Sequence, residues 1–184
     1  MKTQIISSSD NIKIKDLFLL QPEFFADHRG ENFEGYNEKH YDDIFSSSLK
    51  WRSEKNKFIV DSFSKSKKDV LRGFHGDLNT WKLIQCLKGS IYFVVIDLRK
   101  DSETFGVHQS FDLNEENKHQ VLIPNGCVNA HLCVSDECLF HYKFTHEYVA
   151  QKDQIHVKWN DPKHKVFWPV ENPVLSARDK WKIC

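Results

Sequence analysis

The stretch Ile91–Asp97, with the sequence IYFVVID, is apolar on both faces of an extended chain. Successive residues of a strand point to opposite sides of a sheet, so both sides of this stretch call for apolar neighbours. Its β-branched and aromatic residues and its short length suit a strand better than a helix. The stretch therefore predicts a central strand of a β-sheet.

Further short apolar runs lie on both sides of this strand, separated by Gly, Asn, Asp and Pro, which favour turns. The expected strands are Phe58–Phe63, Val70–Phe74, Leu83–Leu87, Ile91–Leu98, Val107–Leu113, Val121–Ile123, Leu132–Val134, Leu139–Phe144 and Ile155–Trp159. A turn is expected over Asn114–Lys118. The best helix candidate is Glu38–Ser47, because Tyr41, Ile44 and Phe45 fall on one helical face. Many short strands at near-even spacing indicate a β-sandwich or barrel.

The composition fits one domain spanning residues 1–184, since the chain of 21.7 kDa has no linker and no internal repeat. Lys plus Arg equals Asp plus Glu at 26 each, so no global field attracts nucleic acid or an anionic membrane. The sequence lacks a secretory signal, and no run of about 18 apolar residues could span a bilayer. We therefore expect a cytoplasmic protein with neither nucleic acid nor membrane as a partner.

The cysteine and histidine patterns argue against a metal site. The five cysteines show no CxxC spacing, which favours buried reduced thiols over disulfides or a zinc site. Two histidines separated by one residue on a strand share a face and can share a metal, but no such pair occurs among the ten. His141 and His146 are five residues apart, which on a strand places them on opposite faces. We expect no metal and no cofactor.

The most specific signal is a set of short segments in a fixed order. They are Asp27–Gly30 (DHRG), Phe33-Glu34, Ser64–Ser66, Val70–His75 (VLRGFH), Lys82-Leu83, Gly89, Asp97–Arg99, Ser102–Gly106 (SETFG), Ile123–Gly126 (IPNG), Tyr142-Lys143, Thr145, Tyr148, Lys158–Pro162 (KWNDP), Trp168-Pro169 and Leu175–Asp179 (LSARD). Each piece alone is weak, but the ordered whole resembles the dTDP-4-dehydrorhamnose 3,5-epimerase family. This resemblance implies an all-β, cupin-type antiparallel barrel (jelly roll) with a few short helices.

The resemblance also implies a chemistry. A 4-keto group acidifies the C–H bonds at C3 and C5 of a sugar, because deprotonation gives an enolate conjugated with the carbonyl. Inversion then needs a base on one face, an acid on the other and a cation near the carbonyl oxygen. By resemblance, His75 is the base, Asp179 orients it, Lys82 stabilises the enolate and Tyr142 returns the proton.

The same resemblance assigns residues that bind the nucleotide-diphosphate sugar. Arg29, Glu34 and Arg72 match ligand-contacting positions, and arginine suits a diphosphate because its planar fork can bond two oxygens. Tyr148 is expected to border the same pocket. Family members pair their barrels by exchanging N-terminal strands, so a homodimer is expected. Arg29 and Glu34, far ahead of the main barrel in sequence, fit such an exchange.

Four positions depart from the family pattern. Asn129 stands where a histidine follows the Ile-Pro-x-Gly segment, and His131, two residues on, would share its face of a strand. Phe93 replaces a polar acid, and Val60 and Ser62 replace Gln and Asn at positions that face the nucleotide. We therefore expect Ser62 and Asn129 to line an altered pocket, and leave open whether His131 substitutes for the missing histidine.

These departures resemble a branch of the family that acts on GDP-linked 6-deoxy-4-keto-heptoses for bacterial surface polysaccharides. The expected function is inversion of C3, with or without C5, in a nucleotide-linked 4-keto-6-deoxy sugar. Two alternatives remain open: a sugar 3,4-ketoisomerase, which moves the carbonyl, and a non-catalytic sugar-binding cupin. The combination of His75, Lys82, Tyr142 and Asp179 favours the epimerase.

Overall fold

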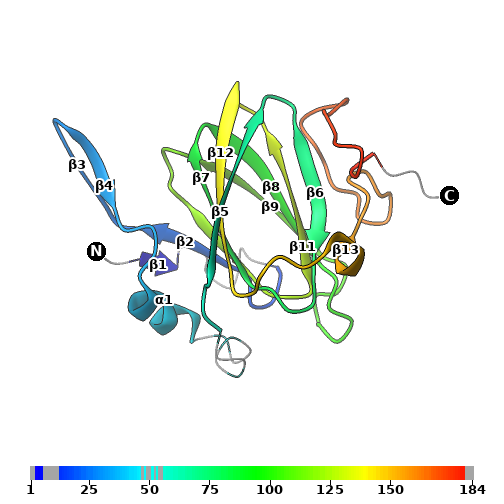
Figure 1. Ribbon diagram of the computed structural model, residues 1–184, viewed down its shortest axis with the longest axis horizontal. Helices are drawn as coiled ribbons and strands as arrows, with labels where there is room; N and C mark the ends of the chain where they lie inside the picture. Colours follow the sequence, from blue (N-terminus) through cyan, green and yellow to red (C-terminus); the bar gives the residue numbers. More distant parts are fainter. Residues whose placement is uncertain are drawn as a thin grey trace.

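Two antiparallel β-sheets face each other and form a barrel (Figure 1). The computed structural model describes residues 3–5, 13–46, 48, 51, 53 and 56–180. One sheet has six strands in the order β1-β2-β10-β7-β12-β5, and the other has five in the order β13-β6-β11-β8-β9. This architecture confirms the antiparallel barrel predicted from the sequence.

The strands of the six-stranded sheet are β1 (Thr3–Ile5), β2 (Phe18–Pro22), β10 (Gln120–Ile123), β7 (Lys82–Lys88), β12 (Glu137–Phe144) and β5 (Val60–Lys67). Those of the five-stranded sheet are β13 (Ile155–His156), β6 (Leu71–Gly76), β11 (Cys127–Cys133), β8 (Ser90–Asp97) and β9 (His108–Asn114). A separate hairpin pairs β3 (Phe24–Asp27) with β4 (Gly30–Phe33). The described residues also include helix α1 (Glu38–Phe45) and the short 3-10 helix η1 (Gln151–Asp153).

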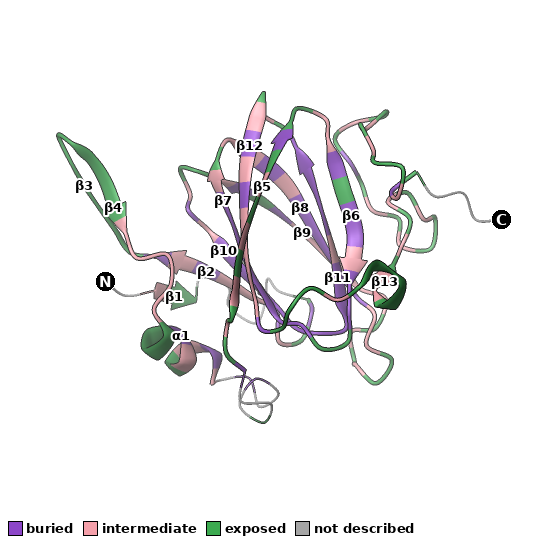
Figure 2. Cartoon of the chain, viewed as in Figure 1, coloured by how far each residue is buried: buried purple, intermediate pink, exposed green. Residues whose placement is uncertain are grey.

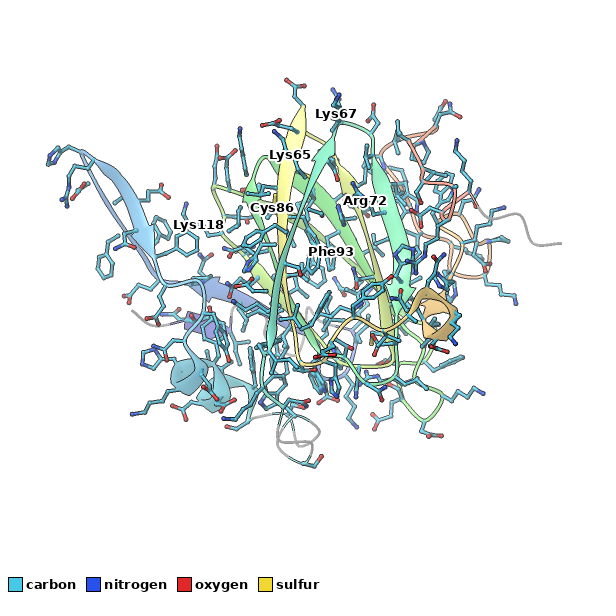
Figure 3. The ribbon with its side chains drawn as sticks, in the orientation of Figure 1. Lys65, Lys67, Arg72, Cys86, Phe93 and Lys118 are labelled. Carbon is cyan, nitrogen blue, oxygen red and sulfur yellow. The ribbon has the colours of Figure 1, made fainter. Side chains whose placement is uncertain are left out.

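Strand β8 has the central position that its sequence predicts, between β11 and β9. Phe93 and Val95 point into the core between the sheets, where Phe93 packs against Phe140 with ring centroids 6.1 Å apart (Figure 3). Val94 and Ile96 face the other way, into a second cluster that includes Trp168 of the C-terminal segment. Both faces of the strand are therefore buried, as Figure 2 shows.

The C-terminal segment packs along β6 although it lies far away in sequence. Val174 forms a parallel bridge with Val70, and the backbone N–H of Leu71 donates to the carbonyl of Val174 at 3.0 Å. Trp168 contacts Phe74 with ring centroids 5.8 Å apart. This packing brings the last described residues beside the end of β6.

Several predicted boundaries were wrong. The strand predicted at Phe58–Phe63 is β5, which begins later, at Val60, and extends to Lys67. Its end was missed because the second half of this edge strand alternates serines with exposed residues and has no apolar run. Strand β11 begins at Cys127, well before the predicted Leu132, and β13 ends at His156 rather than Trp159. The turn after Asn114 is confirmed.

Helix α1 forms where the spacing predicts it. Asn37 caps its first turn by accepting a hydrogen bond from the backbone N–H of His40. Tyr41 and Phe45 are buried, and Ile44 packs beside them in a third apolar cluster. The helix ends at Phe45, and the predicted end at Ser47 lies outside the described residues.

The β3–β4 hairpin is an arm that projects from the barrel (Figure 1). Every residue of β3 is exposed, including Phe24 at 41% and Phe25 at 58%. Gly30 has a φ of 123° at the turn, a conformation that favours glycine. The arm therefore contributes nothing to the core of its own barrel.

The four described cysteines, Cys86, Cys127, Cys133 and Cys138, are buried and form no disulfide with one another. Within the described ranges, no helix combines the length and the apolar character needed to cross a bilayer.

Candidate active site

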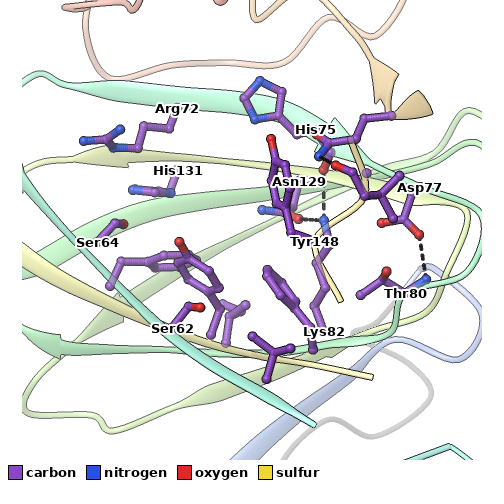
Figure 4. Close-up of a pocket in the computed structure, with 18 of the residues that line it drawn as sticks. Ser62, Ser64, Arg72, His75, Asp77, Thr80, Lys82, Asn129, His131 and Tyr148 are labelled. Atoms are coloured by element: carbon purple, nitrogen blue, oxygen red, sulfur yellow. Dashed lines mark hydrogen bonds between the residues drawn. The ribbon is translucent and has the colours of Figure 1, made fainter. Parts of the chain in front are cut away.

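A cavity of about 290 Å³ opens between the two sheets (Figure 4). Alternate residues of each strand face it, which is why residues two apart recur on its walls. Of the ten residues predicted for the site, seven line this cavity: Ser62, Arg72, His75, Lys82, Asn129, Tyr142 and Tyr148. The structure therefore brings most of the predicted site residues together at one cavity.

His75 forms a dyad with Asp179, which lies behind it. The His75 Nε2 is 2.8 Å from Asp179 Oδ1, and the hydroxyl of Ser176 donates to Oδ2 of the same carboxylate at 2.8 Å. Asp179 is buried although it lies close to the end of the described residues. A carboxylate on one ring nitrogen fixes the tautomer and leaves the other nitrogen free to accept a proton.

Electrostatics suit the dyad to base chemistry. Burial lowers the pKa of His75 below its ordinary value of 6.5, and the Asp179 carboxylate opposes this only in part. Burial alone would raise the pKa of Asp179, but hydrogen bonds from His75 and Ser176 hold it below its usual value. At neutral pH the imidazole is therefore neutral and the carboxylate is charged.

Lys82 lies beside the dyad, at the start of β7. Its Nζ donates to the backbone carbonyl of His75 at 3.1 Å and to Asn129 Oδ1 at 2.9 Å, both drawn in Figure 4. An ammonium group has three protons, so one remains for a ligand. Burial lowers the pKa of Lys82 to about 8. The lysine is thus held in place and is easily converted between its charged and neutral forms.

Tyr142 lies on the opposite wall from His75. It belongs to β12 of the six-stranded sheet, whereas His75 belongs to β6 of the five-stranded sheet. Its ring packs between Phe140 and Phe144, with centroids 5.2 and 4.9 Å away. Burial raises the pKa of Tyr142, which keeps its phenol protonated at neutral pH. A ligand in the cavity would therefore have a base on one side and an acid on the other.

His131 lines the cavity next to Asn129, as their spacing on one strand predicts. Its ring stacks on Phe140 with centroids 4.2 Å apart. Burial, with the neighbouring Arg72 and His75, lowers the pKa of His131 to about 3. So low a pKa makes an imidazole a poor acceptor of a substrate proton, so His131 is badly suited to act as a base.

Two predicted ligand residues lie outside the cavity. Arg29 sits at the tip of the arm and pairs with Asp27, with Nη2 2.6 Å from Oδ2. Glu34 lies just after the arm, where it accepts from Asn37 Nδ2 at 3.3 Å and pairs with His40. Within one chain, neither residue reaches the pocket.

Arg178 is a pocket residue that the sequence reasoning missed. Its Nη2 donates to Gln154 Oε1 at 2.7 Å, and its charge contributes to lowering the pKa of His75. Both Arg178 and Gln154 line the cavity. The available signal was the position of Arg178 immediately before Asp179, in a segment that the resemblance had already identified.

Among the described residues, no three His, Cys, Asp or Glu side chains gather in a way that could hold a metal ion. The polar groups at the cavity instead include His75 with the charged Asp179 carboxylate behind it, one buried lysine, two arginines and several hydroxyl groups. Such a set suits proton transfer and the binding of an anionic, hydroxylated ligand.

Comparison with known proteins agrees with this site. The model of the dTDP-4-dehydrorhamnose 3,5-epimerase family matches residues 11–183. The enzyme of that name from Shigella flexneri is 36% identical over 170 residues, covering 91% of this chain and 90% of its own. A crystal structure of the Bacillus anthracis enzyme with TDP and pyrophosphate bound has a TM-score of 0.84 and 32% identity, and 96% of each chain is covered.

A second solved structure, from Legionella pneumophila, holds dTDP-4-keto-L-rhamnose and has a TM-score of 0.84 at 30% identity. It covers 96% of this chain and 89% of that one. Matches of this extent, in sequence and in fold, show the family to which the chain belongs. They also show its enzyme class, because the members of this family are epimerases, a kind of isomerase. The chain belongs to the dTDP-4-dehydrorhamnose 3,5-epimerase family.

Proposed function

We propose that this chain inverts C3 and C5 of a nucleotide-linked 4-keto-6-deoxy sugar through enolate intermediates. The observation that carries the proposal is the placement of the His75–Asp179 dyad and Tyr142 on opposite walls of one cavity. His75 takes the proton from the carbon next to the carbonyl. Lys82 stabilises the negative charge on the carbonyl oxygen, and Tyr142 delivers a proton to the other face.

The remaining predicted residues bind and orient the sugar nucleotide in this proposal. Arg72 supplies a charged fork for the diphosphate. Tyr148, 71% exposed, borders the cavity, and Ser62 and Asn129 contribute polar groups to its walls. The three relatives described above are named for dTDP-linked sugars, so they lend no support to the GDP-linked heptose expected from the sequence.

The substrate is tested by incubating the protein with GDP-, dTDP- and CDP-linked 4-keto-6-deoxy sugars in deuterated water. We expect deuterium at C3 and C5 together with inversion, read by NMR, for one of the nucleotides. A 3-keto product would instead identify a ketoisomerase. Binding without exchange would identify a sugar-binding protein, and either result would contradict the proposal.

The pH dependence of kcat/KM should be bell-shaped. His75 acts only when neutral, so activity rises as pH passes its pKa, which lies below 6.5. Lys82 acts as a cation, so activity falls as pH passes its pKa of about 8. Measuring kcat/KM between about pH 5 and pH 10 would show both limbs. In Lys82→Arg, whose guanidinium keeps its charge, the falling limb near 8 should disappear. If the falling limb of the profile stayed near pH 8 in this variant, the fall in activity would be due to the titration of another group.

We also propose a homodimer in which the arm of one chain completes the pocket of its partner. The arm exposes Phe24 and Phe25 and holds Arg29 outside its own cavity. Light scattering at micromolar concentration should give twice the chain mass of 21.7 kDa. In Arg29→Ala the dimer should persist while the affinity for the nucleotide sugar falls. A monomeric mass would contradict the exchange of arms.

A further inference from the structure

Three residues that line the cavity have a buried polar atom without a hydrogen-bond partner within the described part of the chain; one atom is Nε of Arg178, whose guanidinium is already held through Nη2 by Gln154. The other two are Nε2 of His131, a residue 3% exposed, and Oγ of Ser64. Both residues line the cavity. Buried polar groups are nearly always paired in native proteins, so two unpaired groups on a pocket wall indicate a ligand group that pairs with them.

The two atoms belong to one end of the cavity. His131 stacks on Phe140, with centroids 4.2 Å apart and planes inclined by 20°, and Phe140 is the direct cross-strand partner of Ser64. His131 is likewise opposite Arg72 in the pairing of β11 with β6. Figure 4 shows Arg72, His131 and Ser64 at the end of the cavity away from Asp77 and Thr80.

Arg72 closes this end by linking the two sheets. Its Nε donates to Ser66 Oγ at 3.0 Å, and its Nη2 donates to the backbone carbonyl of Lys65 at 3.4 Å. These bonds join β6 of one sheet to β5 of the other. The stacked ring of Phe140 fixes the plane of His131, so the orientation of its Nε2 is set before any ligand arrives.

The chemistry of the pair indicates which ligand group it takes. The pKa of about 3 keeps His131 neutral, so its Nε2 either donates or accepts a hydrogen bond but carries no charge. The hydroxyl of Ser64 can do both. A phosphate offers only acceptors and is best bound by charged donors, which is the role proposed above for the neighbouring Arg72 rather than for this pair. A hydroxyl group, which donates and accepts at once, is complementary to this uncharged pair.

We propose that His131 and Ser64 together bind one hydroxyl group of the substrate's sugar and make this end of the cavity a specificity site. The inference deepens the proposed function and rests on it. His131 and Ser64 take no part in proton transfer, because the dyad, Lys82 and Tyr142 already supply the base, the cation and the acid.

The test compares His131→Phe and Ser64→Ala with the unmodified protein. Phenylalanine keeps an aromatic ring on Phe140 and removes both nitrogens, and Ser110→Ala on β9, outside the cavity, is the matched control for the serine. The substrates are nucleotide-linked 4-keto-6-deoxy sugars with and without a hydroxyl group at C2, or at C7 of a 6-deoxy-heptose. The readouts are kcat/KM for each sugar and its Kd by calorimetry.

For one of these positions, we expect the unmodified protein and Ser110→Ala to prefer the hydroxylated sugar by about 10-fold or more. Each cavity variant should lose most of that preference, while turnover of the deoxy sugar is retained, since a site that hydrogen-bonds a hydroxyl rejects analogues that lack it. An unchanged preference in both variants, at both positions, would overturn the inference and leave the epimerase intact. If no sugar is turned over, the proposed function fails. The ratio of the Kd values for the deoxy and hydroxylated sugars then decides: a ratio that falls in the cavity variants supports the hydroxyl site, and an unchanged ratio overturns it.

Discussion

Replacing His75 with alanine should abolish both epimerisation and the exchange of substrate protons with solvent. Both processes require the enolate, and within the described residues the Asp179-paired imidazole is the base we assign to form it. Loss of a general base typically slows a reaction by about 10²- to 10⁴-fold. NMR of a 4-keto nucleotide sugar in deuterated buffer measures both processes at once.

The matched control for this variant is His141→Ala, because His141 pairs with Asp61 and is absent from the cavity wall. It should exchange deuterium at the normal rate. Asp179→Asn should slow exchange and inversion together, without abolishing them, because the imidazolium loses its counter-charge. Full exchange in the His75 variant would remove that residue from the role of base.

The core of the fold could be predicted from the sequence because burial leaves a clear pattern. Strand β8 is apolar on both faces, since one side meets the facing sheet and the other meets Trp168. The edge strand β5 has no such pattern, because Ser62 and Ser64 face the cavity and its lysines face solvent. The exposed arm of β3 and β4 was not predicted as strands at all, since its pairing depends on backbone hydrogen bonds rather than on burial.

The site residues could be predicted only through the ordered motifs that resemble the family. His75 and Asp179 are 104 residues apart, and nothing in local patterning brings them together. Their contact depends on the C-terminal segment docking against β6 through Val174. The chemical environment of the site residues could not be predicted from the sequence. The low pKa of His131 arises from its burial, and the hydrogen bond from Lys82 to Asn129 arises from the way the strands lie next to each other.

Replacing Tyr142 with phenylalanine should abolish inversion of the sugar while the exchange of its protons with solvent continues. In Tyr142→Phe, His75 can still remove the proton, because the dyad and Lys82 are untouched. The phenol that would protonate the other face is gone, so the proton returns to the face it left. Deuterium should therefore enter the sugar while inversion falls by about 10²- to 10⁴-fold, the usual contribution of a general acid.

This separation of exchange from inversion is what distinguishes an acid from a residue that merely shapes the pocket. Phenylalanine preserves the ring that packs between Phe140 and Phe144, so the cavity wall keeps its form. Tyr92→Phe is the matched control, since Tyr92 packs on Trp168 outside the cavity and should invert the sugar at the normal rate. If exchange and inversion fell equally in Tyr142→Phe, the tyrosine would act in substrate binding or enolate formation. Undiminished inversion would mean that the proton on the second face comes from another group, and the two-wall mechanism would be wrong.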